Sequence, residues 1–223
     1  MVNQLDAFWK AFGITCIVFL SGVFMGFWLD SYRVEEIRNE YTDMDISSND
    51  ARLQTLYYQT LSNNDSSFCI PAIQENLIFS DRVYQDGLRI DQYEKINKLA
   101  PSLIKDKTRY VLLKIQFWLN SVRLKRTCNA SYTNLVYFYS HYNTTAQENV
   151  QSAVLMDLKN EYGPGLILVP LPLDLNITTI EIIKKQYGIK TTPTILIDEK
   201  TVIEGPQTRD YLNGKIREAK NAR

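Results

Sequence analysis

Residues that could carry out redox or metal chemistry are few and widely spaced. The chain has three cysteines, Cys16, Cys69 and Cys128, and one histidine, His141, among 223 residues. Zinc and iron–sulfur sites need several cysteine or histidine ligands at short spacing, and no such spacing is present. We therefore expect no metal and no cofactor. No nucleophile with a histidine and a carboxylate can be assembled either, so no catalytic residue is assigned.

Cys69 and Cys128 could still act as a pair, in one of two ways. Each lies beside a loop, Cys69 just before a predicted helix and Cys128 just after another, where a bridge is sterically easier. A disulfide here would be a structural staple contributing on the order of 4 kcal/mol. The alternative is a labile redox pair, which would make the protein a thiol–disulfide oxidoreductase or isomerase. Without C-x-x-C spacing or an adjacent base to lower a thiol pKa, the sequence favours the staple.

The charge balance argues against nucleic acid as a partner. Lys and Arg number 25 and Asp and Glu number 25, without a basic stripe. Binding to phosphates needs clustered Lys and Arg, so this class of ligand is set aside.

A membrane anchor is predicted near the N-terminus. The uncharged run from Ala11 to Leu29 is long enough to cross a bilayer as a helix, and Trp9 and Trp28 lie near its ends, as is typical of spans. A cleaved signal peptide is the competing interpretation, but the run is long for one and no small-x-small cleavage site follows it. We expect a retained helix in contact with lipid, preceded by a short cytoplasmic tail at 1–10.

Three residues within this run have expected roles in packing. Gly22 and Gly26 form a G-x-x-x-G pattern that would let a helix of a protein partner approach closely, although the two glycines could equally have no partner. Cys16 would lie in lipid as a small apolar side chain.

The bulk of the chain is expected on the extracytoplasmic side of a cell membrane, as a single-pass protein. The positive charges that flank the span say little about its orientation, because Lys10 lies before it and Arg33 and Arg38 lie after it. Glycosylation sequons are in modest excess over the roughly two expected by chance. The candidate acceptors are Asn64, Asn129, Asn143 and Asn176.

A helical region is predicted over 31–127. Periodicity indicates helices near 34–41, 52–61, 71–97 and 106–126, the second of them after the start signal S-S-N-D at 47–50. The first of these helices could continue directly out of the membrane. The apolar positions are interpreted as bundle core rather than a cofactor site. They include Leu53, Leu56, Tyr57 and Leu61 on one helix and Val111, Ile115, Trp118 and Val122 on another.

From 133 to 219 the pattern changes to alternating strands and helices. Strands are predicted at 135–139, 166–171, 192–198 and 200–205, with helices at 145–163 and 177–188 and a last one opening near 207. Val150, Val154, Leu155 and Leu158 are the expected inner face of the first helix, and Gly163 its end. The order βαβαββα predicts an α/β fold whose mixed sheet is covered by helices.

This part of the chain resembles the thioredoxin-like superfamily, and is similar to its secreted disulfide-oxidoreductase branch. The residues that carry the resemblance are Y-G-I-K-T-T-P-T at 187–194, with Gly205 matching a glycine after the last strand. The resemblance implies a cis peptide bond before Pro193, located beside the active cysteines of the family.

Those cysteines are missing here. In family members the first strand leads into a pattern like F-Y-S-x-Y-C-x-x-C, and here 138–142 is followed by Asn143-Thr-Thr-Ala146. Asn143 and Ala146 occupy the two cysteine positions, and neither can supply the thiolate that dithiol exchange needs. Asn143 or Thr144 is expected to cap the following helix. His141, beside this stretch, is expected to be simply solvated.

The sequence therefore favours a non-enzymatic function. The expected protein is a membrane-anchored binding or structural module, or a subunit of a larger membrane assembly. The resemblance implies a groove for extended peptide, lined by Tyr142, Thr192 and Pro193. The alternative remains an oxidoreductase or isomerase that uses Cys69 and Cys128.

Overall fold

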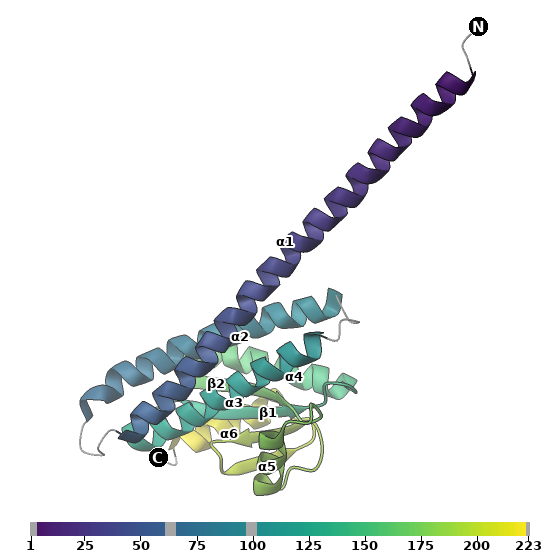
Figure 1. The fold of residues 1–223 in the computed structure, drawn as a ribbon. Helices are drawn as coiled ribbons and strands as arrows, with labels where there is room; N and C mark the ends of the chain where they lie inside the picture. Colours follow the sequence, from purple (N-terminus) through teal and green to yellow (C-terminus); the bar gives the residue numbers. More distant parts are fainter. Residues whose placement is uncertain (1–3, 61–65, 97–101, 222–223) are drawn as a thin grey trace. The chain divides into compact units, whose positions relative to one another are not determined.

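The computed structural model describes residues 4–60, 66–96 and 102–221 (Figure 1). These residues form two compact units, Met1–Asp45 and Ile46–Arg223. The described residues of the first unit are the leading part of helix α1, which runs from Gln4 to Thr60. The second unit holds the end of α1, the other helices and the sheet.

The first unit contains a segment that could cross a membrane. Phe8–Leu29 is helical with a mean hydropathy of 2.1, and none of it is buried within the protein. This agrees with the apolar run seen in the sequence. A signal sequence near an N-terminus satisfies the same criteria of length and composition.

Helix α1 is unbroken where the sequence predicts two separate helices at 34–41 and 52–61. The helix continues through the S-S-N-D stretch, so the predicted start signal there is wrong. Contacts with other parts of the fold can override a local signal for a helix start, and such a contact is observed within the continuous helix. Ala51 is 1% exposed, and its carbonyl oxygen accepts a hydrogen bond from Asn120 Nδ2 at 2.8 Å.

The sheet of the second unit has four strands in the order β2-β1-β3-β4. Strand β1 pairs in parallel with β2 and antiparallel with β3, and β3 pairs antiparallel with β4. The predicted α/β class and the order βαβαββα are confirmed. The strands are β1 Thr133–Tyr139, β2 Leu166–Pro172, β3 Thr194–Ile197 and β4 Thr201–Glu204. The helices are α2 Cys69–Ile96, α3 Ser102–Cys128, α4 Ala146–Tyr162, α5 Thr178–Tyr187 and α6 Arg209–Asn221, with short 3-10 turns at Ser66–Phe68 and Gly163–Gly165.

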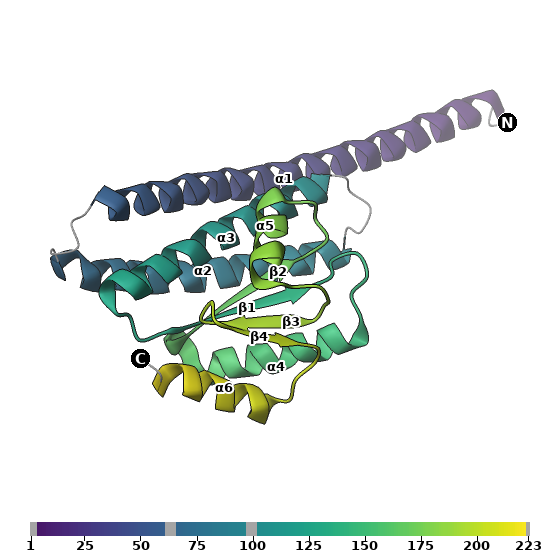
Figure 2. The same cartoon turned by 90° about the horizontal axis from the view of Figure 1, so that it is seen from below.

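Helices cover both faces of this sheet, as Figure 2 shows. Alternate residues of a strand point to opposite faces, so Val136 and Phe138 enter one core and Leu135 and Tyr137 the other. The first core is completed by α3 and α5, and the second by α4 and α6. Val150 is 64% exposed, so its predicted place on the inner face of α4 is wrong. The buried positions of α4 are Glu148, Gln151, Leu155 and Leu158.

Helix α3 packs directly on the sheet, although the sequence pattern predicts a separate helical region for it. Its predicted apolar stripe is buried, including Trp118 at 2% exposure. Trp118 Nε1 donates a hydrogen bond to Glu199 Oε1 in the β3–β4 turn at 2.7 Å, and Lys125 forms an ion pair with Asp198 in the same turn. Helix α3 and the sheet therefore share one core, with no boundary between compact units at residues 128–132.

The end of α1 contacts α3 mainly through polar side chains. Gln116 Nε2 donates to Thr55 Oγ1 at 2.6 Å, and Thr55 also hydrogen-bonds to Asn120. Because this polar face turns inward, the predicted core face is exposed. Leu53 is 63%, Leu56 50% and Tyr57 59% exposed, whereas Leu61 lies outside the described residues.

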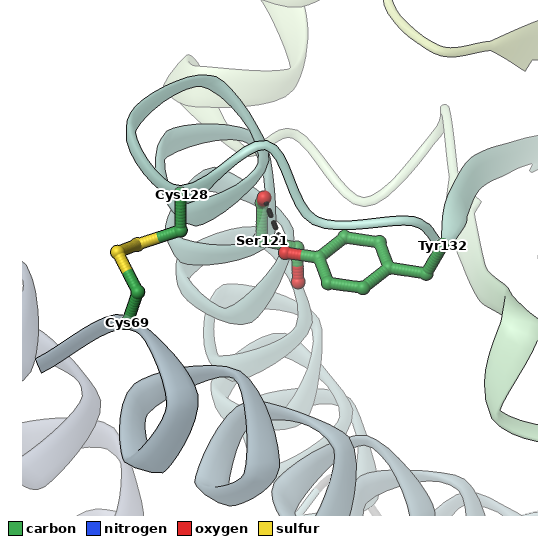
Figure 3. The surroundings of a disulfide bond; sticks show 4 residues. All are labelled: Cys69, Ser121, Cys128 and Tyr132. Carbon is green, nitrogen blue, oxygen red and sulfur yellow. Dashed lines mark hydrogen bonds between the residues drawn. A yellow bond between two sulfur atoms is a disulfide. The ribbon is translucent and has the colours of Figure 1, made fainter. Parts of the chain in front are cut away.

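A disulfide joins the first residue of α2 to the last residue of α3 (Figure 3). The Cα atoms of Cys69 and Cys128 are 5.4 Å apart across a sequence separation of 59 residues. Nearby, the Tyr132 hydroxyl donates to the Ser121 carbonyl oxygen at 2.7 Å, which ties the start of β1 to α3. The bridge therefore lies where the helical pair meets the sheet.

Candidate functional site

The candidate site lies where β1 ends and β3 begins. The peptide bond between Thr192 and Pro193 is cis, as the resemblance implies. Gly188, at φ 66°, ends α5 in the left-handed conformation and begins the short loop to this bond. Gly205 N donates to the Pro193 carbonyl oxygen at 2.8 Å, so the end of β4 is joined to the same loop.

The start of α4 faces this loop and is closed by a capping box. Thr145 is the N-cap, and its hydroxyl oxygen accepts from Glu148 N at 3.2 Å. In return, Glu148 Oε2 accepts from Thr145 N at 2.6 Å. Such a T-x-x-E pair satisfies two N–H groups that the helix itself leaves without partners. The predicted caps Asn143 and Thr144 are therefore wrong, because the helix begins later than the sequence suggests.

Glu148 connects three segments of the site. It is 1% exposed, and its Oε1 accepts a hydrogen bond from Ser140 N, just after β1, at 2.7 Å. The Thr192 side chain also hydrogen-bonds to this carboxylate. Burial by itself would raise the pKa of Glu148, but the hydrogen bonds from Thr145, Ser140 and Thr192 outweigh it and hold the pKa below its ordinary value.

A second carboxylate, Asp174 after β2, holds the same loop from the other side. It accepts from Ser140 Oγ at 2.7 Å, His141 N at 2.8 Å and Tyr142 N at 3.0 Å. Partial burial opposes the charged form of Asp174, but these hydrogen bonds prevail and lower its pKa. The loop after β1 is thus held in one conformation by two ionised side chains.

These two carboxylates should make the protein less stable in acid. A pKa lowered by folding contributes stability that is complete above the unfolded-state pKa and is lost as pH falls toward the folded-state pKa. We expect the free energy of unfolding to decline from roughly pH 5 downward. The double variant Glu148→Gln, Asp174→Asn should flatten this decline, as measured by denaturant unfolding between about pH 3 and 7. An equally steep decline in the variant would contradict the role given to these two groups.

Two pairs of residues with a spacing of three lie at the start of α4. Asn143 is exposed in the turn before α4 and Ala146 is the first residue of the helix, and their match to the cysteine positions stays a prediction. Thr145 and Glu148 have the same spacing, and Glu148 contacts Thr192 beside Pro193. Sequence reasoning missed this second pair, although the T-x-x-E capping signature was readable at 145–148.

The predicted groove residues differ in exposure. Tyr142 is 57% exposed, Thr192 is half-buried and Pro193 is buried. The His141 ring lies against Tyr142, with 4.9 Å between ring centroids. Tyr142 therefore offers the largest accessible apolar surface among the residues that the sequence singled out.

The remaining predicted sites are the four candidate glycosylation sites, and no metal site is predicted. Asn129, Asn143 and Asn176 are exposed, whereas Asn64 lies outside the described residues. Within the described ranges there is no cluster of three or more His, Cys, Asp or Glu side chains that could hold a metal ion. Whether sugar is attached to these asparagines stays a prediction.

Comparisons with known proteins bear on the fold alone. No protein-family model and no curated protein matches this sequence. Among solved structures, the chain is similar to a protein described as a malarial protein, with 22% identity over 40% of this chain and 97% of that one and a TM-score of 0.34. It is also similar to the thioredoxin Deadhead of Drosophila melanogaster, with 11% identity over 45% of this chain and 92% of that one and a TM-score of 0.34. Thioredoxin O2 of Arabidopsis thaliana in its oxidized state has 16% identity over 45% of this chain and 84% of that one, with a TM-score of 0.32.

The sheet has a thioredoxin-like fold. The assignment rests on the strand order β2-β1-β3-β4 with its parallel and antiparallel pairs, and on the helices covering both faces. A fold of this kind can host many functions, so the activity has to be argued from the site.

Proposed function

We propose that this protein is a membrane-anchored, thioredoxin-like binding or structural module that performs no thiol–disulfide exchange at its thioredoxin-like site. The supporting observation is Glu148. A buried carboxylate that accepts hydrogen bonds from Ser140, Thr145 and Thr192 fills the helix start beside Pro193. Exchange requires a thiolate there, and a carboxylate engaged in this way cannot replace one.

The cysteines support the same proposal. Cys69 and Cys128 are joined to each other, and Cys16 lies within the apolar segment Phe8–Leu29. The bridge connects the ends of two packed helices, which suits a structural staple. The alternative, an oxidoreductase that uses this bridge, would require it to be reduced at glutathione-like potentials.

Two experiments test this proposal. One assays the unmodified chain for thiol–disulfide exchange, and the other introduces cysteine pairs at the start of α4. The full-length chain in detergent micelles should show no reduction of insulin by a dithiol above the uncatalysed rate. The variant Thr145→Cys, Glu148→Cys should form a disulfide, because a helix N-cap and the residue three positions later lie within bridging distance. The matched variant Asn143→Cys, Ala146→Cys places the cysteine pair at the positions that the sequence predicts. Mass spectrometry of trapped thiols would show which pair cross-links, and insulin reduction by the unmodified chain would refute the proposed function.

We further propose that the anchor is retained and that the bulk of the chain faces outward. The proposal is supported by the uncharged helix within 8–29 and by three exposed sequons. Protease added to intact cells should remove residues beyond the span and leave a small membrane-bound fragment. Full-length protein protected from protease until the membrane is opened would contradict this orientation.

The partner of the module is proposed to be a protein. Of the predicted groove residues, Tyr142 is exposed and Thr192 half-buried beside the buried Pro193, and an extended chain could lie against them. Gly22 and Gly26 have no other atom within 4 Å of an added Cβ, so a helix of a partner could pack there.

A further inference from the structure

The turn between β3 and β4 lies at the end of the sheet opposite the candidate site. It follows Ile197, which pairs with Leu135 in the early part of β1, whereas the candidate site lies where β1 ends. Its central residues, Asp198 at φ 50° and Glu199 at φ 56°, both have the left-handed conformation. Glycine and asparagine usually occupy such positions, and a glutamate there is strained unless surrounding contacts hold it. The surroundings of the two carboxylates must therefore stabilise this conformation.

The Glu199 carboxylate is held between helix α3 and strand β1. Trp118 Nε1 of α3 donates to Glu199 Oε1 at 2.7 Å, and Asn134 Nδ2 of β1 donates to the same oxygen at 3.3 Å. Both donors belong to buried residues, and Glu199 itself is half-buried. A charged carboxylate in such a place loses part of its water, which opposes the ionised form. Glu199 thus joins α3 to the sheet at a position where its own charge is unfavourable.

The charged and titratable groups around this carboxylate come from the turn, α3 and α5. Asp198 precedes Glu199 in the turn and forms an ion pair with Lys125 of α3. Tyr187, at the end of α5, is close enough to interact with the charge of Glu199, and Arg126 of α3 lies near Tyr187. Burial is the first cause that raises the pKa of Glu199, and Asp198 adds to the rise. Hydrogen bonds to the carboxylate and the charge of Lys125 oppose this rise but do not prevail.

Asn134 can hold Glu199 both with and without a proton. Its Nδ2 donates to the carboxylate, whereas its buried Oδ1 has no hydrogen-bond partner among the residues that the structure describes. A half-turn of the amide exchanges these two atoms, so that Oδ1 accepts from the O–H of a protonated carboxyl group. Trp118 can donate in either case, because a protonated carboxyl group keeps an acceptor oxygen. The contact between α3 and the sheet therefore persists in both states, and its strength is what changes.

We propose that the contact of Glu199 with Trp118 and Asn134 is a pH-sensitive switch, which holds α3 on the sheet more firmly when the carboxylate takes up a proton from water. The switch goes beyond the proposed binding function and does not depend on it. A folded-state pKa that is raised contributes stability that is complete below the unfolded-state pKa and is lost as pH rises through the folded-state pKa. The contact should therefore weaken as pH rises above the ordinary value of 4.5. This dependence is opposite in sign to that of Glu148 and Asp174 at the other end of the sheet.

Unfolding of the full-length chain in micelles between about pH 5.5 and 7.5 tests the switch, since Glu148 and Asp174 stay ionised in this range. All chains carry His141→Gln, because the single histidine titrates there as well. We expect the midpoint of denaturant unfolding to move to lower denaturant concentration as pH rises. A midpoint that does not move with pH would overturn the proposal.

Two matched variants assign this pH dependence to one carboxylate. Glu199→Gln keeps an acceptor for Trp118 but cannot titrate, so the pH dependence should be lost and the midpoint at about pH 7.5 should be higher than in the unmodified chain. Glu204→Gln changes an exposed carboxylate at the end of β4 and should keep the pH dependence. A pH dependence that persists in Glu199→Gln, or that Glu204→Gln removes equally, would overturn the proposal.

The fluorescence of Trp118 provides a local measurement of the same proton. The chain has three tryptophans, so Trp9→Phe, Trp28→Phe leaves Trp118 as the only one. Its emission should titrate because its indole N–H contacts Glu199. Lys125→Met removes a positive charge that favours the ionised carboxylate, so the titration midpoint should move to higher pH. Emission that titrates unchanged in Glu199→Gln, or a midpoint that moves to lower pH in Lys125→Met, would overturn the proposal.

Discussion

Replacing Glu148 with alanine is expected to lower the free energy of unfolding by about 2 to 4 kcal/mol, because two backbone N–H groups lose their acceptor. These groups are Ser140 N and Thr145 N, both partly buried. Thr192 loses its hydrogen-bond partner as well. Denaturant unfolding of the full-length chain in micelles, followed by circular dichroism, would measure the loss.

The neighbouring position supplies the control. Gln147 is exposed on the same turn of α4, so Gln147→Ala should change stability by no more than about 0.5 kcal/mol. Glu148→Gln retains an acceptor oxygen and should fall between the two. If Glu148→Ala were no more destabilising than Gln147→Ala, the carboxylate would not be the group that holds the site together.

Removing the disulfide should have an effect of similar or larger size. The double variant Cys69→Ser, Cys128→Ser opens a loop closed across 59 residues, and the chain-entropy estimate for such a loop is about 4 kcal/mol. The bridge also packs beside a small cluster formed by Tyr58, Ala72 and Leu124, which joins α1, α2 and α3. We therefore expect the three helices to loosen together, with faster hydrogen exchange at residues 46–60.

Two comparisons isolate the bridge from other thiol effects. Cys16→Ser should leave unfolding unchanged within about 0.5 kcal/mol, since Cys16 forms no disulfide. A dithiol reductant should shift the unfolding curve of the unmodified chain onto that of the double variant, and should not shift the variant itself. An unmodified chain that unfolds at the same point with and without reductant would show that the bridge contributes little.

Elements with strong local signals could be predicted from the sequence. The strands and helices after residue 133 have clear periodicity, and Gly163 and Gly188 end α4 and α5 as expected. The mixed sheet followed from their order alone. The stripe of α3 through Trp118 was also found, because apolar residues at helical spacing mark a buried face wherever the helix packs.

The sequence by itself thus determined the fold class, the apolar segment near the N-terminus and the absence of a C-x-x-C pair. Tertiary structure decided which faces meet. Leu53 and Val150 are apolar yet exposed, whereas Glu148 and Gln151 are polar yet buried. Part of what surrounds these two buried side chains comes from segments distant in the chain. Thr192 meets Glu148, and Gln207 meets Gln151, only after the sheet has formed. Periodicity indicates which face of a helix is apolar, whereas the partner of each face is a property of the folded chain.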